Sequence, residues 1–523
     1  MPWTSRFIED LQAQPADPIF LVHFTMPGGS AVVPGVDEIT LSSSHEYGDV
    51  VGLGMDIQVS GQSLRPVEWS YTAASASVTF VADSPNSLTH TVRRGQITKI
   101  MMGFPGYSTA DFQPIFVGRL SSISGRGPNW HMSFEDGTTL LQQQLTGTAT
   151  RRLFADADQS LTTNYTTIAS SSYSAGDSTI NVADNSKLRI SAHSGAVGMV
   201  KIEPDSGDPF YVKYTGKGSG TITGAGSGVH DTTASNAAIG KKVWNVPLLN
   251  GTALTIYKRL LISDGTGVAA DDPNVYPVEW GLGVPEEYVD IDDIDAQASV
   301  LVTDGVTCSP EWKVLEVQSS PWPWLFGLFK ELGLIPVMRQ GQYTIRAIQK
   351  PSDATIISGI TISDDEIIAY EWSAYHPDVQ SSFLGVTVTT SNGSSTTSVM
   401  ASTTFPVDYV LTYDLTDTTW AHSTSGQTKI RSNITGRCAQ WGTFVPYALK
   451  LDCAGLRLAQ LCPGDVVTVS LQDLDATNGY DEIYTGLVET AGWTNRSALV
   501  TAVSADFVAG LVSLELSVVP EFE

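Results

Sequence analysis

The sequence LCPGDVVTV at 461–469 decides the fold, and three further short runs follow it at 483–488, 499–503 and 511–516. The runs are rich in β-branched residues, several alternate apolar with polar residues, and Gly, Asn and Asp separate them. This pattern is typical of short antiparallel strands joined by turns. The Pro463-Gly464 pair marks a tight turn that leads into a strand. The C-terminal part of the chain is therefore predicted to be an antiparallel meander or a small β-barrel.

A weaker copy of the same pattern lies near the N-terminus. The matching segments are 95–100 with 464–469, 115–120 with 483–488, and 130–134 with 499–503. The turn glycine and the mid-strand glycine are almost equally spaced in the two copies. We therefore expect two similar β-barrels, one at each end of the chain. The alternative is a chance likeness between two meanders, since glycine and β-branched residues recur in any all-β protein.

Composition sets the broad class of the protein. The chain has 523 residues, of which 42% are apolar, a content typical of a folded protein with about three or four domains. Only 16% are charged, and 55 acids against 29 bases give a formal charge of −26. Binding of nucleic acid by neutralising its phosphates needs a basic surface, so this composition argues against it. An acidic wall instead suits a conduit through which a polyanion slides without sticking.

Targeting and cofactor motifs are not visible in the sequence. The N-terminus shows no signal-peptide pattern, and no stretch reaches the roughly 18 apolar residues of a membrane helix. The four cysteines, Cys308, Cys438, Cys453 and Cys462, form no CxxC pair, which argues against zinc or redox chemistry. Buried free thiols are the expected state, and an iron–sulfur site is the alternative. We expect no cofactor and no metal.

The expected fold class is mainly β with a small α+β part, divided into several domains. The expected domains are a β-barrel at 1–165, an inserted Ser/Gly-rich β-domain at 166–247, an α+β unit at 248–350, and a second barrel with a long loop at 351–523. In the first domain, spacing predicts a helix over 4–14 that packs on the barrel, and strands at 19–24, 56–59 and 77–81. His23, within a strand, is expected in the core.

The inserted domain contains a glycine-rich loop, GAGSGVHDTT at 224–233. It lacks the lysine and the following helical pattern of a phosphate-binding loop, so a nucleotide site is not expected. Exposed polar strands and long loops would suit contact with a neighbouring protein or a sugar.

The α+β unit begins with a predicted helix within 248–265 and continues to an acidic cluster. The cluster consists of Glu286, Glu287, Asp290, Asp292, Asp293 and Asp295. Such acids raise the question of glycoside hydrolysis or calcium binding. The spacing does not match an EF-hand loop. The simpler interpretation is a helix N-terminus, where the helix dipole favours negative charge.

A helix and a hairpin are predicted next. Ser320 and Pro321 begin an apolar-faced helix that ends at Gly333, and 337–346 forms a hairpin with Gly341 in its turn. Trp322 and Trp324 suggest a sugar platform, but packing into a core or a subunit interface is the favoured interpretation.

The last domain opens with less regular sequence. A Ser/Thr-rich region at 389–404 looks like a long hairpin tip or a mobile loop, and 409–413 looks like a strand. Leucines at 448–461 suggest a helix, although Gly455 weakens that prediction.

The order of these elements resembles that of the baseplate or tail-tip hub proteins of long-tailed bacteriophages. The resemblance depends on the "FVG" strand at Gly118, the helix and hairpin at 321–346, the CPGDVV segment, "YTGLV" and "VSADFVAGLVSLEL". The "WGLGVP" turn at 280–285 and the Ser/Gly-rich insertion also resemble segments of tail-tip proteins of such phages. The resemblance implies a homotrimer whose six barrels continue a six-fold tail tube and meet a three-fold tip. Implied partners are the tail tube or distal tail protein and spike, tip or fibre proteins. DNA would pass the lumen without specific binding.

Two hypotheses follow. The first is a structural virion protein of the tail tip, made in the host cytoplasm and not an enzyme. The second is a receptor-binding or polysaccharide-depolymerising tail protein that uses the acids at 286–295 and Trp322. Against the second, no nucleophile elbow, HExxH motif or β-helix repeat is present in the sequence. Neighbouring acids on one segment also rarely face each other across a cleft as glycosidase carboxylates must.

Overall fold

The computed structural model describes most of both ends of the chain and parts of its middle. The described residues are 3–13, 18–25, 39–65, 70–82, 92, 94, 96–138, 159–160, 162, 164–188, 197–226, 228–229, 232–246, 248–249, 253–262, 288–303, 312–313, 329, 333–349, 354, 358–373, 385–390, 395–399, 410–415, 428, 431–432, 434–435, 447–471 and 493–518. The described chain is mainly β, as the sequence predicts, with several separate sheets and a few short helices.

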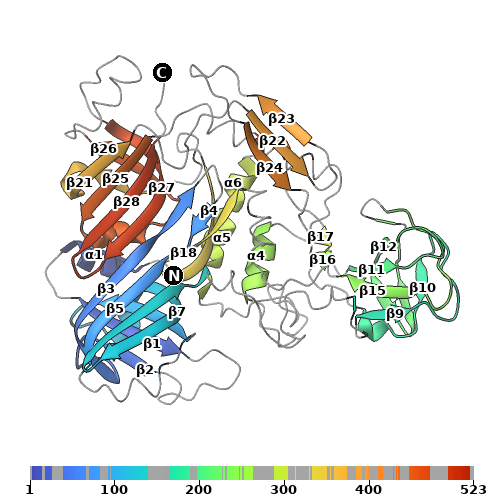
Figure 1. Cartoon of the computed structure of the whole chain (residues 1–523), viewed down its shortest axis with the longest axis horizontal. Coiled ribbons are helices and arrows are strands. Elements are labelled where there is room, and N and C mark those ends of the chain that lie inside the picture. Colours follow the sequence, from blue (N-terminus) through green and yellow to red (C-terminus); the bar gives the residue numbers. More distant parts are fainter. Residues whose placement is uncertain are drawn as a thin grey trace.

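The N-terminal strands form a closed barrel, which we call the first barrel (Figure 1). Its strands are β1 (Ile19–Thr25), β2 (Ile39–Ser42), β3 (Val50–Arg65), β5 (Ser75–Ala82), β6 (Ile97–Gly103), β7 (Gln113–Arg126) and β8 (Asn129–Asp136). Their order is β2-β1-β6-β7-β8-β5-β3, and parallel pairing of β2 with β3 closes the ring. The short β4 (Ser70–Thr72) extends it beside β3. Alternating burial along β5 and β6 shows why these sequences form strands with one face in a core.

The C-terminal strands form a second, open barrel of similar order. Its strands are β20 (Thr361–Ser363), β21 (Ile367–Ser373), β25 (Tyr447–Ala454), β26 (Val466–Leu471), β27 (Trp493–Asp506) and β28 (Leu511–Val518). Neighbouring strands follow the order β21-β25-β28-β27-β26-β20, antiparallel except for the last pair. In the first barrel, β3, β5, β8, β7 and β6 follow one another in the same way. The predicted internal repeat is therefore present in the strand order.

The pairing register shows how closely the strand pair β7–β8 of the first barrel agrees with the strand pair β27–β28 of the second. β7 and β27 each have 14 residues, and β8 and β28 each have 8. Leu120 pairs with Phe134 just before a bulge in the first barrel, and Val500 pairs with Leu516 just before a bulge in the second. A β-bulge is a specific structural feature rather than random irregularity. Agreement in strand order, length and bulge position argues against a chance likeness of two meanders.

The same registers correct part of the predicted alignment. Residues 97–100 of β6 and 466–469 of β26 do correspond, because each run pairs in the same way with the next strand. The equivalent of 115–120 is 495–500, rather than the predicted 483–488, which lies outside the described residues. The equivalent of 130–134 is 512–516, rather than the predicted 499–503. The segment between β26 and β27 is longer than its counterpart between β6 and β7. The predicted alignment did not allow for this extra length, so it matched β7 and β8 with segments too early in the second barrel.

The inserted unit is a small β-structure with a core of its own. One sheet has the order β12-β11-β15-β9, and the other has the order β10-β14-β13. The strands are β9 (Tyr165–Thr167), β10 (Thr179–Asn181), β11 (Gly198–Ile202), β12 (Phe210–Tyr214), β13 (Gly216–Gly218), β14 (Thr221–Thr223) and β15 (Lys242–Val246). They enclose a separate apolar cluster that includes Tyr173, Phe210 and Tyr214. Figure 1 shows this unit well apart from the barrels.

The middle of the chain contributes short helices and a hairpin. The helices are α4 (Ala253–Ile262), α5 (Ile291–Ala296) and α6 (Ala298–Thr303). The strands are the pair β16 (Leu248–Leu249) with β17 (Trp312–Lys313), and the hairpin β18 (Leu334–Arg339) with β19 (Gln342–Ala347). Positive φ angles at Gln340 and Gly341 make the tight hairpin turn, as predicted for Gly341. The helix predicted to start at Ser320, with Trp322 and Trp324, lies almost entirely outside the described residues.

In the last domain, one prediction agrees in part with the structure and one was wrong. The Ser/Thr-rich region begins as a hairpin, as one of its two predicted alternatives has it, because β22 (Gly385–Thr390) pairs antiparallel with β23 (Ser395–Val399), and both form a sheet with β24 (Val410–Leu415). Residues 448–461 are not an α-helix: β25 ends at Ala454, and a 3-10 turn covers Leu456–Gln460. Leu449, Leu451 and Cys453 are buried while the residues between them are exposed, which is the period of a strand.

Candidate functional site

The two barrels meet along one pair of strands, which we call the joint. β27 of the second barrel pairs antiparallel with β3 of the first, with Ala502 opposite Ser63 and Asp506 opposite Gln58. This pairing merges both barrels into one 14-stranded sheet. At Gly61, an added Cβ would lie 1.7 Å from the carbonyl oxygen of Val503, so only glycine permits the observed approach.

The N-terminal helix also bridges the two barrels. α1 (Ser5–Ala13) contacts the 3-10 turn at Leu456–Gln460 of the second barrel. Phe7 is fully buried and packs against Phe104 of the first barrel. The sequence predicted this helix and its packing on a barrel, and the structure adds the contact with the second barrel.

A buried polar network lies beside the joint. The Gln62 amide nitrogen donates to the Met338 carbonyl oxygen at 3.0 Å and to the Asp136 carboxylate at 3.3 Å. Asp136 also accepts from the backbone N–H groups of Ala74 at 2.7 Å and Thr138 at 2.8 Å. Burial raises the pKa of the Asp136 carboxyl, and these hydrogen bonds offset the shift only in part. The network connects β3 and the end of β8 in the first barrel with β18 of the hairpin.

The hairpin β18–β19 reaches the first barrel at its tip and along its length. The Trp3 backbone N–H donates to the Gln340 side-chain oxygen at 2.9 Å, and the Tyr343 hydroxyl donates to the Gly137 carbonyl oxygen at 2.6 Å. An added Cβ at Gly341 would lie 2.8 Å from Val117 of β7. These contacts fix the hairpin against one end of the barrel.

The other end of the hairpin is held by a buried ion cluster. Arg346, only 3% exposed, donates from Nε to Asp465 at 2.8 Å and from Nη1 to the Asp293 carboxylate. Burial alone would lower the pKa of this guanidinium, but the two carboxylates raise it well above its usual range. Burial opposes the ionised form of Asp465, yet Arg346 and Arg339 hold the pKa of that carboxyl below its ordinary value.

The predicted Pro-Gly turn places Asp465 in this cluster. The Asp465 backbone N–H donates to the Cys462 carbonyl oxygen at 3.1 Å, which closes the turn. Gly464 has a φ of +94°, and an added Cβ there would lie 2.6 Å from the Cβ of Arg346. Glycine is therefore needed both for the backbone conformation and for the close approach of the hairpin.

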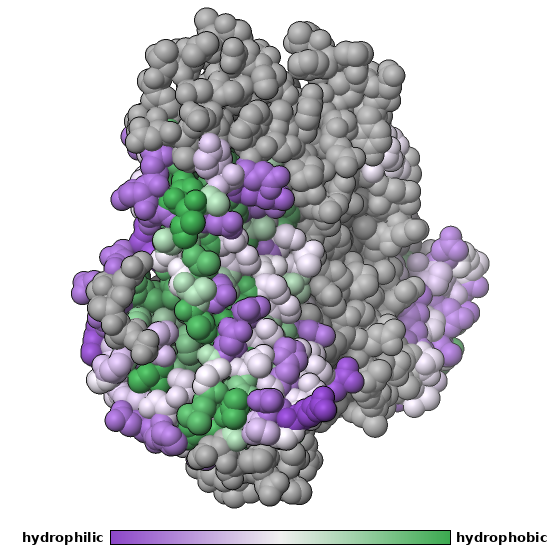
Figure 2. All heavy atoms as spheres, turned by 60° about the vertical axis from the view of Figure 1, so that its left-hand side comes forward, coloured by the Kyte–Doolittle hydropathy of each residue, from purple (hydrophilic) through white to green (hydrophobic). Residues whose placement is uncertain are grey.

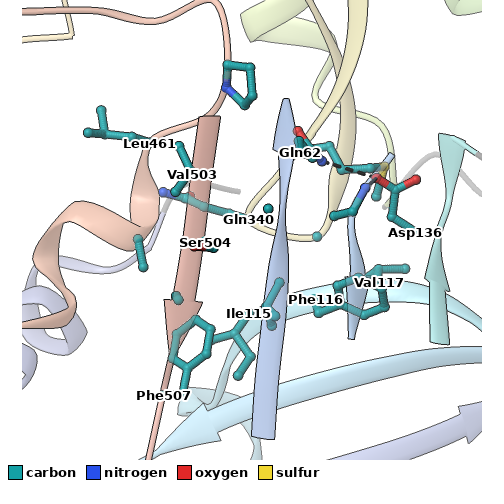
Figure 3. Close-up of a pocket in the computed structure, with 18 residues that line it drawn as sticks. Gln62, Ile115, Phe116, Val117, Asp136, Gln340, Leu461, Val503, Ser504 and Phe507 are labelled. Carbon is teal, nitrogen blue, oxygen red and sulfur yellow. Dashed lines mark hydrogen bonds between the residues drawn. The ribbon is translucent and has the colours of Figure 1, made fainter. Parts of the chain in front are cut away.

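A small cavity of about 70 Å³ lies between the two barrels and the hairpin (Figure 3). Its wall is mostly apolar, with Ile115, Phe116 and Phe507 on one side and Gln62 and Asp136 on the other. Asp136 and the Gln62 amide nitrogen bond to each other and to backbone groups, whereas the buried side-chain oxygen of Gln62 has no hydrogen-bond partner. The cavity is a small space within the packing of the joint.

The acidic cluster has structural partners where the structure describes it. The Asp290 side chain accepts from the backbone N–H of Asp293 and begins α5, as the helix-terminus interpretation predicts. Asp293 binds Arg346, and Asp295 binds Lys258 at 2.6 Å. Glu286 and Glu287 lie outside the described residues. Asp292 is exposed in the first turn of α5.

Two of the four cysteines lie in the part of the chain that the structure describes. Cys453 and Cys462 are buried and free, and burial raises the pKa of the Cys453 thiol to about 12. Cys308 and Cys438 lie outside the described residues, so the iron–sulfur alternative is untested. Within the described ranges, no group of three or more His, Cys, Asp or Glu side chains is arranged to hold a metal ion. No described helix is long and apolar enough to cross a membrane.

The solved structures to which the chain is similar include the following three. One is the 43 kDa tail protein of prophage MuSo2 from Shewanella oneidensis, with 10% identity over 95% of this chain and 98% of that chain and a TM-score of 0.39. Another is a tail protein from Neisseria meningitidis MC58, with 10% identity over 96% and 97% of the two chains and a TM-score of 0.38. The third belongs to the virion of a native gene transfer agent particle, with 12% identity over 68% and 76% and a TM-score of 0.29. No protein family and no curated protein matches the sequence.

Proposed function

We propose that this protein is a structural component of a bacteriophage tail tip, in which three copies place six similar barrels around a channel. The observation that supports the proposal is the repeat itself: two barrels of matching strand order and register, joined side by side in one sheet. Three chains that each carry two similar barrels present six similar docking surfaces. Such a ring would adapt a six-fold tail tube to a three-fold tip.

The charge of the chain suits the channel of this proposed ring. With a formal charge of −26, the protein repels DNA rather than binding it, so a genome would pass the lumen without being retained. The proposed partners are the tail tube or distal tail protein on one side and spike, tip or fibre proteins on the other. The proposed location is the tail tip of the virion, and no catalytic role is proposed.

The ring is tested by measuring the mass of the purified chain by light scattering over a range of concentrations and averaging electron micrographs of the particles. We expect a mass of three chains and a ring of six similar lobes around a hole. A chain that stays a monomer at every concentration, with and without tail-tube protein, would contradict the proposal. In that case the receptor-binding or depolymerase hypothesis would be tested next on capsular polysaccharide.

A further inference from the structure

The joint shows how this chain covers an exposed barrel edge. In β27, the first half pairs with β26, and the second half pairs on the same edge with β3 of the other barrel. The equivalent strand in the first barrel is β7. Its first half pairs with β6, and no described strand pairs with that edge beyond Arg119. β7 therefore presents the same half-strand edge that β3 covers on β27.

Burial confirms the difference between the two edges. Ala505 of β27 is 8% exposed beneath β3, whereas its equivalent in β7, Gly125, is exposed. The neighbouring residues Ser122, Ser124 and Arg126 are also exposed. An unpaired strand edge of this kind can accept another strand, and proteins usually block or cover it.

The complementary edge lies on the second barrel. β21 is the equivalent of β3, and among the described strands it pairs only with β25. Two large apolar side chains are exposed on it, Ile368 at 61% and Tyr370 at 38%. Tyr370 occupies the place of Ile57 in the first barrel, which is fully buried. Figure 2 shows the side of the molecule on which β21 lies in Figure 1, and apolar atoms are exposed there between polar ones.

We propose that β21 of one copy pairs antiparallel with the second half of β7 in the next copy, repeating between chains the joint that β3 and β27 form within a chain. The register follows from the joint. Arg126 occupies the place of Asp506, and Glu371 occupies the place of Gln58. Because Asp506 lies opposite Gln58, Arg126 of one copy lies opposite Glu371 of the next.

Charge agrees with this register, since the pair consists of an exposed cation and an exposed anion. Opposite charges directly across two strands stabilise the pairing, and like charges oppose it. The contact joins different surfaces of two copies, so it is a head-to-tail interface of the kind that generates rings. The inference rests on the proposed ring and specifies which strands close it.

Cysteine cross-linking tests the register directly. A chain carrying Arg126→Cys is mixed with a chain carrying Glu371→Cys, and the mixture is oxidised. We expect a disulfide that joins an Arg126→Cys chain to a Glu371→Cys chain. The wild-type chain, and each variant oxidised by itself, should not form this disulfide. The matched control is Gln58→Cys with Asp506→Cys in a single chain, which holds the equivalent positions of the joint and is expected to cross-link within the chain.

Charge reversal gives a second measurement that does not depend on thiols. Arg126→Glu is expected to weaken self-association about tenfold or more, and adding Glu371→Arg to the same chain is expected to restore it. Both positions are exposed, so neither change disturbs a core. If the chain forms a trimer that neither cross-links at these positions nor responds to reversal, the register is wrong while the proposed function stands. If no oligomer forms at any concentration, both are overturned.

Discussion

Arg346 in the hairpin and Asp465 in the turn before β26 form a buried ion pair between residues 119 positions apart, with Nε donating to Oδ1 at 2.8 Å. The pair joins the middle of the chain to the second barrel, while Gly137 and Gln340 tie the same hairpin to the first. The hairpin therefore contacts both barrels and fixes the position of one barrel relative to the other. A ring built from such chains needs this relation to be rigid.

Removing the cation of this cluster is predicted to destabilise the fold strongly. Arg346→Met leaves Asp465 and Asp293 without their buried partner, which typically costs about 3–5 kcal/mol of unfolding free energy. Urea unfolding followed by tryptophan fluorescence measures the loss. The control is Asp295→Asn, which breaks the more exposed pair with Lys258 and should cost no more than about 1 kcal/mol. Equal losses in the two variants would show that burial of the Arg346 cluster is not what stabilises the chain.

The same cluster predicts a pH dependence. The pKa of Asp465 is lower in the folded chain than the usual value of about 3.9, so its ionised form stabilises the fold. That contribution is fully present above about pH 4 and is lost as the pH falls through the lower folded value. In Asp465→Asn the stability should therefore fall less steeply below pH 4 than in the wild type. Denaturant midpoints from pH 7 to pH 2.5 test this, and parallel curves would contradict it.

Asp136 is predicted to act in the opposite direction. Its pKa is raised in the folded chain, so its contribution to stability is fully present below the unfolded value of about 3.9 and is lost as the pH rises through the folded value. The groups around the Asp136 carboxyl are all N–H and O–H donors, and they favour its ionised form, whereas burial favours its protonated form and is the larger effect. In Asp136→Asn an amide hydrogen faces these donors, and we expect a loss of about 1–3 kcal/mol at neutral pH in the same unfolding assay. An unchanged midpoint would contradict this.

The repeat could be predicted from sequence only where strand spacing is undisturbed. Residues 97–100 and 466–469 align because each run follows a turn directly and pairs in the same register. Beyond β26, the longer connection to β27 contains a second β-like run at 483–488, and local pattern alone cannot tell which run is the repeated strand. Pairing across the sheet decides it, because the bulges after Leu120 and Val500 match.

The joint and its polar network were missed at the sequence level for a similar reason. Gln62, Asp136 and Arg346 come from distant segments, and no local spacing brings them together. Gly61 was the available signal, because a glycine inside a strand pattern indicates close approach of another backbone. The acidic helix terminus was predicted correctly, since capping by Asp290 depends on neighbours in sequence.

Glycine at 464 is predicted to be needed for more than its backbone angle. Gly464→Ala places a methyl group 2.6 Å from the Cβ of Arg346 in addition to straining a φ of +94°. Gly510→Ala is the matched control, because its φ is also positive at +70° but nothing lies within 4 Å of the added Cβ. Strain alone costs about 1–3 kcal/mol. The thermal midpoint should therefore fall further for Gly464→Ala, and equal shifts would show that the hairpin moves aside freely.

Glycine at 61 is the most direct test of the joint. Alanine there would place Cβ 1.7 Å from the Val503 carbonyl oxygen, and that oxygen belongs to a strand that β28 holds in place, with Val503 opposite Leu514. β3 must then separate from β27, at a cost of about 1–3 kcal/mol for overpacking. The control Gly226→Ala meets no atom within 4 Å and should leave stability nearly unchanged. Because the joint couples the two barrels, Gly61→Ala should also split thermal unfolding into two transitions in calorimetry. One sharp transition at the wild-type midpoint would instead mean that α1 and the hairpin are enough to couple the barrels.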